Sequence, residues 1–121
     1  MTEKENSKRY DLEDRTEEFA RKARDFVRKV PKTLANNEDC RQLVRASGSV
    51  GANYIEANDA LSKKDFIMRI KICRKEAKET RYWLRLLDAG NDCRLEDERK
   101  KLVQEAQELM NIFGSILKKS Q

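Results

Sequence analysis

Residues 45–57 have the sequence RASGSVGANYIEA, and residues 62–87 follow with SKKDFIMRIKICRKEAKETRYWLRLL. In both stretches apolar and small residues recur in alternating steps of three and four. This spacing places them in a stripe along one side of a helix, the seam, which faces the interior of a helix bundle. The seam residues of the first predicted helix of this pair are Cys40, Leu43, Ser47, Val50, Tyr54, Ala57 and Leu61. Those of the helix that follows it are Phe66, Ile70, Cys73, Ala77, Thr80, Leu84 and Leu87. The pattern predicts two long helices that pack against each other.

Two further apolar patterns flank this pair. One covers residues 11–30, where Pro31 stops it, and the other is clearest over residues 102–116. Their seam residues are Leu12, Phe19, Ala23, Phe26, Val30, Leu102, Ala106, Leu109, Phe113 and Ile116. Because the links are short, consecutive helices must run antiparallel. The sequence predicts an all-α, antiparallel up-down-up-down four-helix bundle, one domain over residues 1–121 with residues 1–10 and 119–121 frayed.

Local signals set the expected ends of the two central helices. Asn36 and Asn37 are expected to cap the second helix at its start. Ser62, three residues before Asp65, predicts a capping box at the start of the third helix. Gly90 is expected to end that helix in the left-handed conformation.

The composition argues against several classes of protein. Histidine is absent, and Cys40, Cys73 and Cys93 have no paired spacing, so we expect neither a Cys/His metal site nor disulfides. No stretch approaches the ~18 apolar residues of a membrane span, and the polar first ten residues lack the apolar part of a signal peptide. We therefore expect a cytoplasmic protein with free thiols and without a cofactor, metal or membrane partner.

The net charge of +5 is concentrated in one segment. Residues 62–89 carry nine basic and four acidic side chains, whereas the two signs balance over the rest of the chain. The basic residues along one flank of the third helix are Lys71, Arg74, Lys75, Lys78, Arg81 and Arg85. Such a stripe is a candidate surface for the phosphates of RNA or DNA. The alternative is a solvated helix face with intrahelical ion pairs such as Lys75–Glu79.

The second and third helices carry more apolar surface than one seam uses. The additional residues are Gly48, Gly51 and Ile55 in the second helix and Met68, Ile72, Trp83 and Leu86 in the third. Interior glycines each cost about 1 kcal/mol against alanine, so they predict a close approach of helix backbones. Two apolar stripes on one helix indicate two packing partners, and we expect these residues at a subunit interface. The alternative is ordinary scattered surface apolar residues.

Four polar residues border these apolar faces: Asn53, Glu56, Arg69 and Glu76. Arg69 and Glu76 share one border of the third helix, and Asn53 and Glu56 border the small-residue face of the second. If these faces meet, a buried Arg–Glu pair would fix the register or the subunit geometry at some cost in stability. Catalysis is the alternative, since carboxylates act as acids, bases or metal ligands. Without histidine there is no Glu-x-x-His motif of the di-iron bundles and no base to activate a cysteine. We therefore favour structural contacts and expect no enzyme.

The small-residue run, the Asn53-x-x-Glu56 spacing and the Ser62-x-x-Asp65-Phe66 opening resemble the four-helix-bundle proteins named for bacterial 23S ribosomal RNA intervening sequences. The resemblance covers the full length in helix layout and implies a homopentameric ring; most members have no established activity. It extends to accessory proteins of diversity-generating retroelements, which are basic pentamers that bind nucleic acid and a reverse transcriptase. The chain has Ala57 where many members have glycine, and its basic third helix leans toward the anion-binding relatives.

The leading hypothesis is a non-enzymatic, homo-oligomeric scaffold or adaptor, a pentamer by resemblance, whose basic surface binds RNA or DNA. The second is an oligomeric protein–protein interaction module without a nucleic-acid role, whose partner is a reverse transcriptase or another protein. Binding that weakens steeply with salt favours the first hypothesis, and no binding at low salt favours the second.

Overall fold

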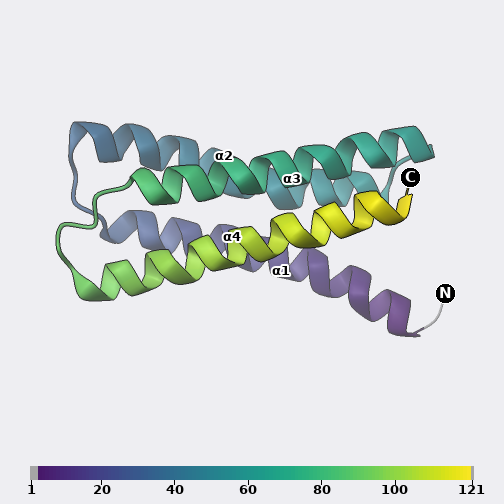
Figure 1. Ribbon diagram of the computed structural model, residues 1–121, viewed down its shortest axis with the longest axis horizontal. Coiled ribbons are helices and arrows are strands. Elements are labelled where there is room, and N and C mark those ends of the chain that lie inside the picture. Colours follow the sequence, from purple (N-terminus) through teal and green to yellow (C-terminus); the bar gives the residue numbers. More distant parts are fainter. Residues whose placement is uncertain (1–2, 121) are drawn as a thin grey trace.

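The chain forms four long α-helices, and consecutive helices run in opposite directions (Figure 1). The computed structural model describes the backbone of residues 3–120 and the side chains of residues 12–120. The helices are α1 (Glu3–Lys29), α2 (Leu34–Asn58), α3 (Lys63–Leu86) and α4 (Cys93–Ser120). The predicted antiparallel four-helix bundle is confirmed. The fraying of the chain ends stays a prediction, and residues 1, 2 and 121 lie outside the described residues.

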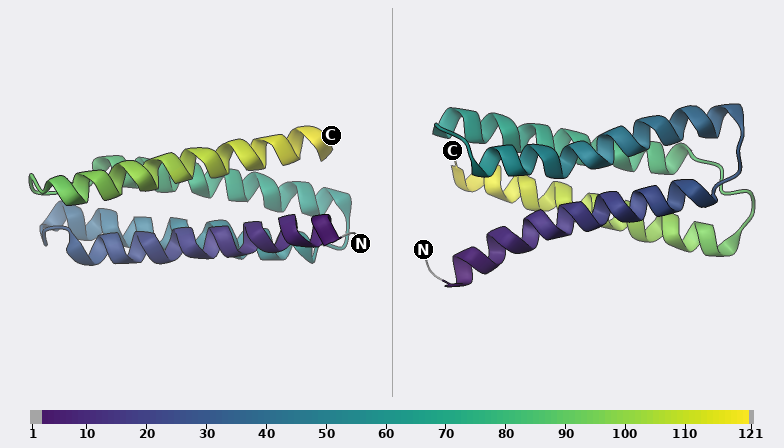
Figure 2. Two further views of the ribbon diagram at one scale, coloured as in Figure 1. Left: turned by 90° about the horizontal axis from the view of Figure 1, so that it is seen from below. Right: turned by 180° about the vertical axis from the view of Figure 1, so that it is seen from behind.

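Each helix packs against its neighbours in sequence, and α1 also contacts α4 to close the bundle. Within residues 3–120 no Cα atoms of the diagonal pairs, α1 with α3 and α2 with α4, lie within 8 Å of each other, as expected for helices at the corners of a square. Only side chains reach across the diagonal, as the rings of Tyr54 and Phe113 do, with centroids 6.1 Å apart. The α1–α4 contact is the smallest of the four, and the first turns of α1 diverge from the other helices (Figures 1 and 2). The backbone of the N-terminal turns of α1 therefore lies apart from the other helices.

The core consists of the seam residues of all four helices. The largest fully buried apolar side chains are those of Phe19, Phe26, Phe113, Leu43, Ile70, Leu84, Leu87, Leu109 and Val50. Cys40, Phe66 and Ile116 are partly buried against this core. Leu61 is fully exposed, because α2 ends at Asn58 and leaves it in the link to α3. The prediction that Leu61 continues the seam of the second helix is therefore wrong.

The starts of α2 and α3 follow local side-chain chemistry. Ser62 caps α3 as predicted, and its Oγ accepts a hydrogen bond from the Asp65 N–H at 3.0 Å. For α2 the prediction was wrong, because the cap is Thr33 in place of Asn36 or Asn37. The Thr33 hydroxyl accepts from the Asn36 N–H at 3.1 Å, so the helix begins one turn earlier.

The α3–α4 link also differs from expectation. Gly90 has the predicted positive φ, 69°, but α3 already ends at Leu86. Asn36 is buried, and its side chain donates to the Asp88 carbonyl at 2.9 Å and accepts from the Asp88 N–H at 3.0 Å. The guanidinium of Arg99 in α4 donates to carbonyl oxygens in the last turn of α3. These tertiary contacts hold the chain in a non-helical path before the glycine is reached.

α1 and α2 approach closely at Gly51. A Cβ atom there would lie 2.9 Å from Thr16 Oγ1 and 3.2 Å from Thr16 Cβ. Thr16 is buried, and its hydroxyl donates to the Leu12 carbonyl at 3.0 Å, which holds the side chain in place. At Gly48 a Cβ would lie 3.3 Å from a guanidinium nitrogen of Arg24. Both glycines thus face α1 of the same chain.

Polar side chains link α2 to α3. Arg69 Nη1 donates to Asn53 Oδ1 at 3.0 Å, and the Asn53 amide nitrogen donates to the carbonyl and the hydroxyl of Ser49, both at 2.9 Å. Asn53 and Arg69 therefore meet across the helix contact. Glu56 is exposed, and its carboxylate makes no hydrogen bond or ion pair with any other described residue.

Glu76 is a buried carboxylate whose partner is Arg45 of α2. Glu76 Oε2 lies 3.7 Å from Arg45 Nη1, and Glu79 Oε2 lies 3.4 Å from Arg45 Nη2. Glu76 Oε2 accepts no hydrogen bond from the described part of the chain. Burial raises the pKa of Glu76, and the neighbouring Glu79 carboxylate raises it further.

We predict that Gly51→Leu lowers the free energy of unfolding by about 1–3 kcal/mol, because the new side chain is forced against Thr16. Urea denaturation measures the change. Gly114→Ala is the matched control: its Cβ would lie 3.9 Å from Arg74 Nε, an ordinary contact, and alanine favours a helix by about 1 kcal/mol over glycine. Equal effects of the two substitutions would contradict the close approach at Gly51.

We predict that Glu76→Gln raises the midpoint of thermal unfolding at pH 8 and changes it little at acid pH. Because the folded-state pKa of Glu76 is raised, its favourable contribution is complete below the unfolded pKa and is lost as pH rises through the folded pKa. Glutamine stays neutral and avoids this loss. Glu56→Gln, which makes the same substitution at an exposed carboxylate of α2, is the matched control. A wild-type advantage that grows with pH would refute the prediction.

Candidate functional site

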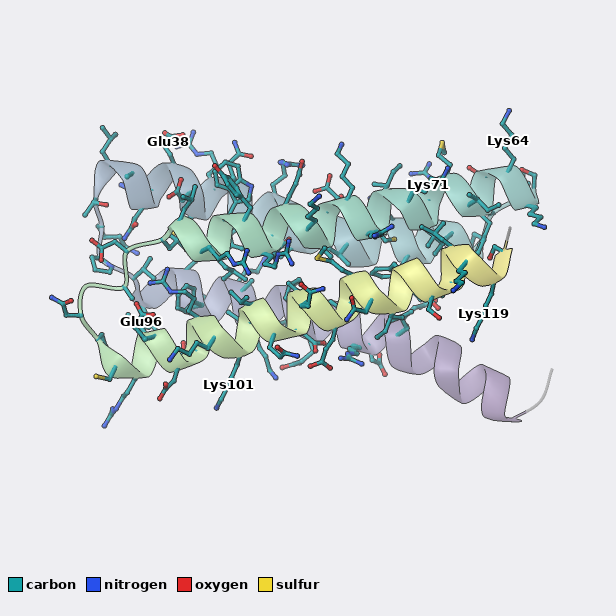
Figure 3. All side chains as sticks on the ribbon, in the orientation of Figure 1. Glu38, Lys64, Lys71, Glu96, Lys101 and Lys119 are labelled. Carbon is teal, nitrogen blue, oxygen red and sulfur yellow. The ribbon has the colours of Figure 1, made fainter. Side chains whose placement is uncertain are left out.

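A shallow groove between α3 and α4 is lined by cationic side chains. The lining residues are Lys71, Arg74, Lys75 and Lys78 from α3 and Met110, Gly114, Leu117 and Lys118 from α4. The five cations are exposed, whereas Met110 and Leu117 are buried between the two helices. Figure 3 marks Lys71 on α3, in the half of the bundle that holds the chain termini. Four of the six residues of the basic stripe therefore lie in one groove.

The helical repeat brings these cations together. Lys71 and Lys78 are separated by about 10 Å along the axis of α3, at ~1.5 Å per residue. On α4, Gly114 has no side chain, and the guanidinium of Arg74 lies over this position. Lys118 follows Gly114 by four residues and therefore shares its face of α4. Lys118 is the groove residue that the basic stripe did not indicate, because it lies on another helix.

Arg81 and Arg85, the other members of the predicted stripe, are placed differently. Arg81 is half-buried, and its Nη1 donates to the side-chain oxygen of Gln107 in α4. Arg85 is exposed in the last turn of α3. Neither residue lines the groove, so Arg81 acts as a link between α3 and α4 and Arg85 extends the positive charge toward the end of the helix.

No carboxylate is among the residues that line the groove. The intrahelical pair considered for Lys75 and Glu79 does not form, since Glu79 pairs with Arg45 of α2. Beside the groove α4 carries the neutral side chains of Gln107 and Asn111, which hydrogen-bond to each other at 3.1 Å. Among the described residues, the groove cations have no ion-pair partner within 4.0 Å. The groove therefore keeps its full positive charge.

Three acidic residues of α4, Glu98, Glu105 and Glu108, pair with cations of α1. Arg15 of α1 binds Glu105 with two bonds, Nε–Oε2 at 2.7 Å and Nη2–Oε1 at 2.8 Å, and contacts Glu108 at 2.9 Å. Lys29 Nζ lies 2.7 Å from Glu98 Oε1. The α1–α4 contact therefore joins charges of opposite sign, whereas the cations on the α3–α4 side are unpaired among the described residues.

An apolar group is exposed on the outside of α3. Met68 and Leu86 are 46% and 49% exposed, and Ile72 and Trp83 are half-buried. Tyr82, which is 55% exposed, packs edge-on against Trp83 with ring centroids 5.0 Å apart. These side chains leave a partly apolar surface that the bundle of one chain does not cover.

The other residues proposed for a subunit interface lie on a different side of the molecule. Gly48 and Gly51 face α1, as described above, and Ile55 follows Gly51 by four residues and is 49% exposed. The seven residues therefore form two separate groups in the structure. Their role in a subunit interface stays a prediction.

The cysteines are free, and Cys73 is a core residue. Burial raises the pKa of the Cys73 thiol to about 12, so the thiol stays protonated. Among the residues that the structure describes, no three His, Cys, Asp or Glu side chains gather as metal ligands. None of the described helices has a stretch both long and apolar enough to span a membrane.

Comparison with known proteins agrees with the helix layout. A solved structure similar to this one is that of a protein of unknown function from the S23 ribosomal protein family of Bacteroides thetaiotaomicron, 30% identical, with a TM-score of 0.70 over 88% of this chain and 98% of that chain. No curated protein matches the chain. The family model described as 23S rRNA-intervening sequence protein matches residues 8–115, which include residues of all four helices. The resemblance is thus confirmed, and the chain belongs to the 23S rRNA-intervening sequence protein family.

Proposed function

We propose that this protein is a non-enzymatic, homo-oligomeric scaffold whose α3–α4 groove binds the phosphate backbone of RNA or DNA. The observation that supports the proposal is the set of five exposed cations that line one groove without a carboxylate among them. Two like charges ~10 Å apart in water repel by only about 0.4 kcal/mol, so the fold tolerates the cluster. Their summed field nevertheless attracts a polyanion.

The shape and chemistry of the groove favour a polymer of phosphates. The cations extend along α3 over about 10 Å, which suits several phosphates in a row better than a single one. No aromatic side chain is among the lining residues, so the groove offers no platform on which bases could stack. We therefore expect contacts to the backbone with little preference for base sequence.

The exposed apolar group on α3 favours self-association. Met68, Tyr82 and Leu86 are each about half exposed on one helix, and surfaces of this kind commonly mark contacts with other proteins. Family resemblance suggests a pentamer, in which each groove would be present five times. The same group supports the second candidate function, a protein–protein interaction module without nucleic acid.

We predict that the protein binds fluorescein-labelled RNA or duplex DNA in an anisotropy titration, with an affinity that falls steeply with salt. Five phosphate contacts would give a slope of about −4.5 for log K against log salt on duplex DNA. Replacement of Arg74, Lys78 and Lys118 by glutamate should abolish binding, because it reverses the charge of the groove.

The control variant carries Lys22→Glu, Lys32→Glu and Lys101→Glu, exposed positions outside the groove that lower the net charge by the same six units. Lys101 projects from the side of α4 remote from α3 (Figure 3). This variant should retain most of the affinity. Equal loss in both variants would indicate a general charge effect, and salt-insensitive or absent binding at low salt would favour the protein-interaction module.

We predict that size exclusion coupled to light scattering gives a mass well above the 14.2 kDa of one chain at micromolar concentration. The physical reason is the apolar surface that α3 leaves uncovered. A mass of 14.2 kDa at every concentration tested would refute self-association and leave the groove proposal untouched.

A further inference from the structure

The bundle is hollowed at the end where α2 passes into α3 and where α4 finishes. The hollow is lined by the last turn of α2, the link after it, the first turn of α3 and the last turn of α4. Figure 3 marks Lys64 and Lys119 at this end of the molecule. We call this feature the end hollow. No carboxylate is among its lining residues, although Asp59 and Asp65 lie nearby in the sequence.

Two large apolar side chains line the end hollow. Leu61 in the link is fully exposed, and Phe66 of α3 is half-buried and packs in part against the core. The α3–α4 groove has no aromatic side chain on which a base could stack. The end hollow supplies one, together with an exposed leucine. Aromatic rings accept any base in this way, because every base has a π-face.

Cations accompany the apolar side chains. Lys63 begins α3 and Lys119 lies in the last turn of α4, and both line the end hollow. Both side chains are exposed, and neither forms an ion pair with another described residue. Positive charge beside an aromatic ring suits a nucleotide of a strand, since the base offers a face for stacking and the phosphate a negative charge.

The end hollow adjoins the groove. On α4, Lys118 lines the groove and the next residue, Lys119, lines the end hollow. On α3, Phe66 precedes the groove residue Lys71 by five positions, which is about 7.5 Å along the helix axis. A strand that advances ~3.4 Å per nucleotide covers this distance in two or three nucleotides. One strand can therefore contact both features.

We infer that the end hollow takes an unpaired base of a strand whose phosphates lie in the groove, so that the protein prefers single-stranded nucleic acid to a duplex. The inference rests on the proposed function and names its substrate class, and it does not depend on the number of subunits. A base inside a duplex is stacked and paired, and its release costs free energy. A duplex is also stiff over ~150 base pairs, whereas a single strand can turn from the side of the bundle onto its end.

Three labelled probes test the preference in anisotropy titrations at low salt. They are an oligo(dT) strand, a strand of abasic sugar phosphates of the same length, and the duplex of that oligo(dT) with oligo(dA). Wild-type protein should bind oligo(dT) at least about fivefold more tightly than the abasic strand, because only oligo(dT) has bases to stack. It should also bind oligo(dT) more tightly than the duplex. The duplex carries twice the charge, so phosphate contacts alone would give the opposite order.

Leu61→Ser tests the position of the base. This variant should bind oligo(dT) only as tightly as the abasic strand and should bind the abasic strand like wild type, because the groove cations are unchanged. Leu34→Ser is the matched control, on an 83% exposed leucine at the opposite end of α2, and should keep the preference. Circular dichroism checks that both variants are folded. If Leu61→Ser is unfolded, the wild-type comparison of oligo(dT) with the abasic strand decides the matter.

The outcomes separate this inference from the proposed function. Failure of all three probes to bind at low salt overturns the groove and the end hollow together. An abasic strand or a duplex that binds wild type as tightly as oligo(dT) overturns the end hollow alone and leaves the groove standing. Folded Leu61→Ser that keeps the full preference also overturns it. In that case a lower mass of Leu61→Ser by light scattering would assign the leucine to a subunit contact.

Discussion

The packing of α3 against α2 and α4 is the constraint on which the other features of this molecule depend. Its core seam is buried, and the middle of the seam consists of the small residues Cys73, Ala77 and Thr80. Once this face is fixed, the helical repeat decides where every other side chain of α3 lies. Arg69 and Glu76 meet α2, and Arg74 and Lys78 lie beside α4. Met68, Tyr82 and Leu86 are left exposed to solvent.

The distribution of charged and neutral side chains on α4 is the second constraint on the structure. Glu98, Glu105 and Glu108 pair with Lys29 and Arg15 of α1, and neutral residues face the basic flank of α3. Exposed ion pairs of this kind are each worth about 0–1 kcal/mol. They therefore compensate the small α1–α4 contact only modestly, and α1 is held mainly through α2 and the close approach at Gly51. The same distribution leaves the groove without internal neutralisation.

The sequence was sufficient for the fold because the apolar period of each helix is a local property of the chain. Local rules failed where residues far apart in the sequence contact each other. Asn36 is a residue type that commonly caps helices, but its hydrogen bonds to the Asp88 backbone hold it inside the bundle. Spacing within one helix also cannot give the register between two helices. Hence the sequence was enough to place the basic stripe on α3. Arg45, the partner of Glu76, and Lys118, which contributes to the groove, lie on other helices, so only the structure could identify their roles.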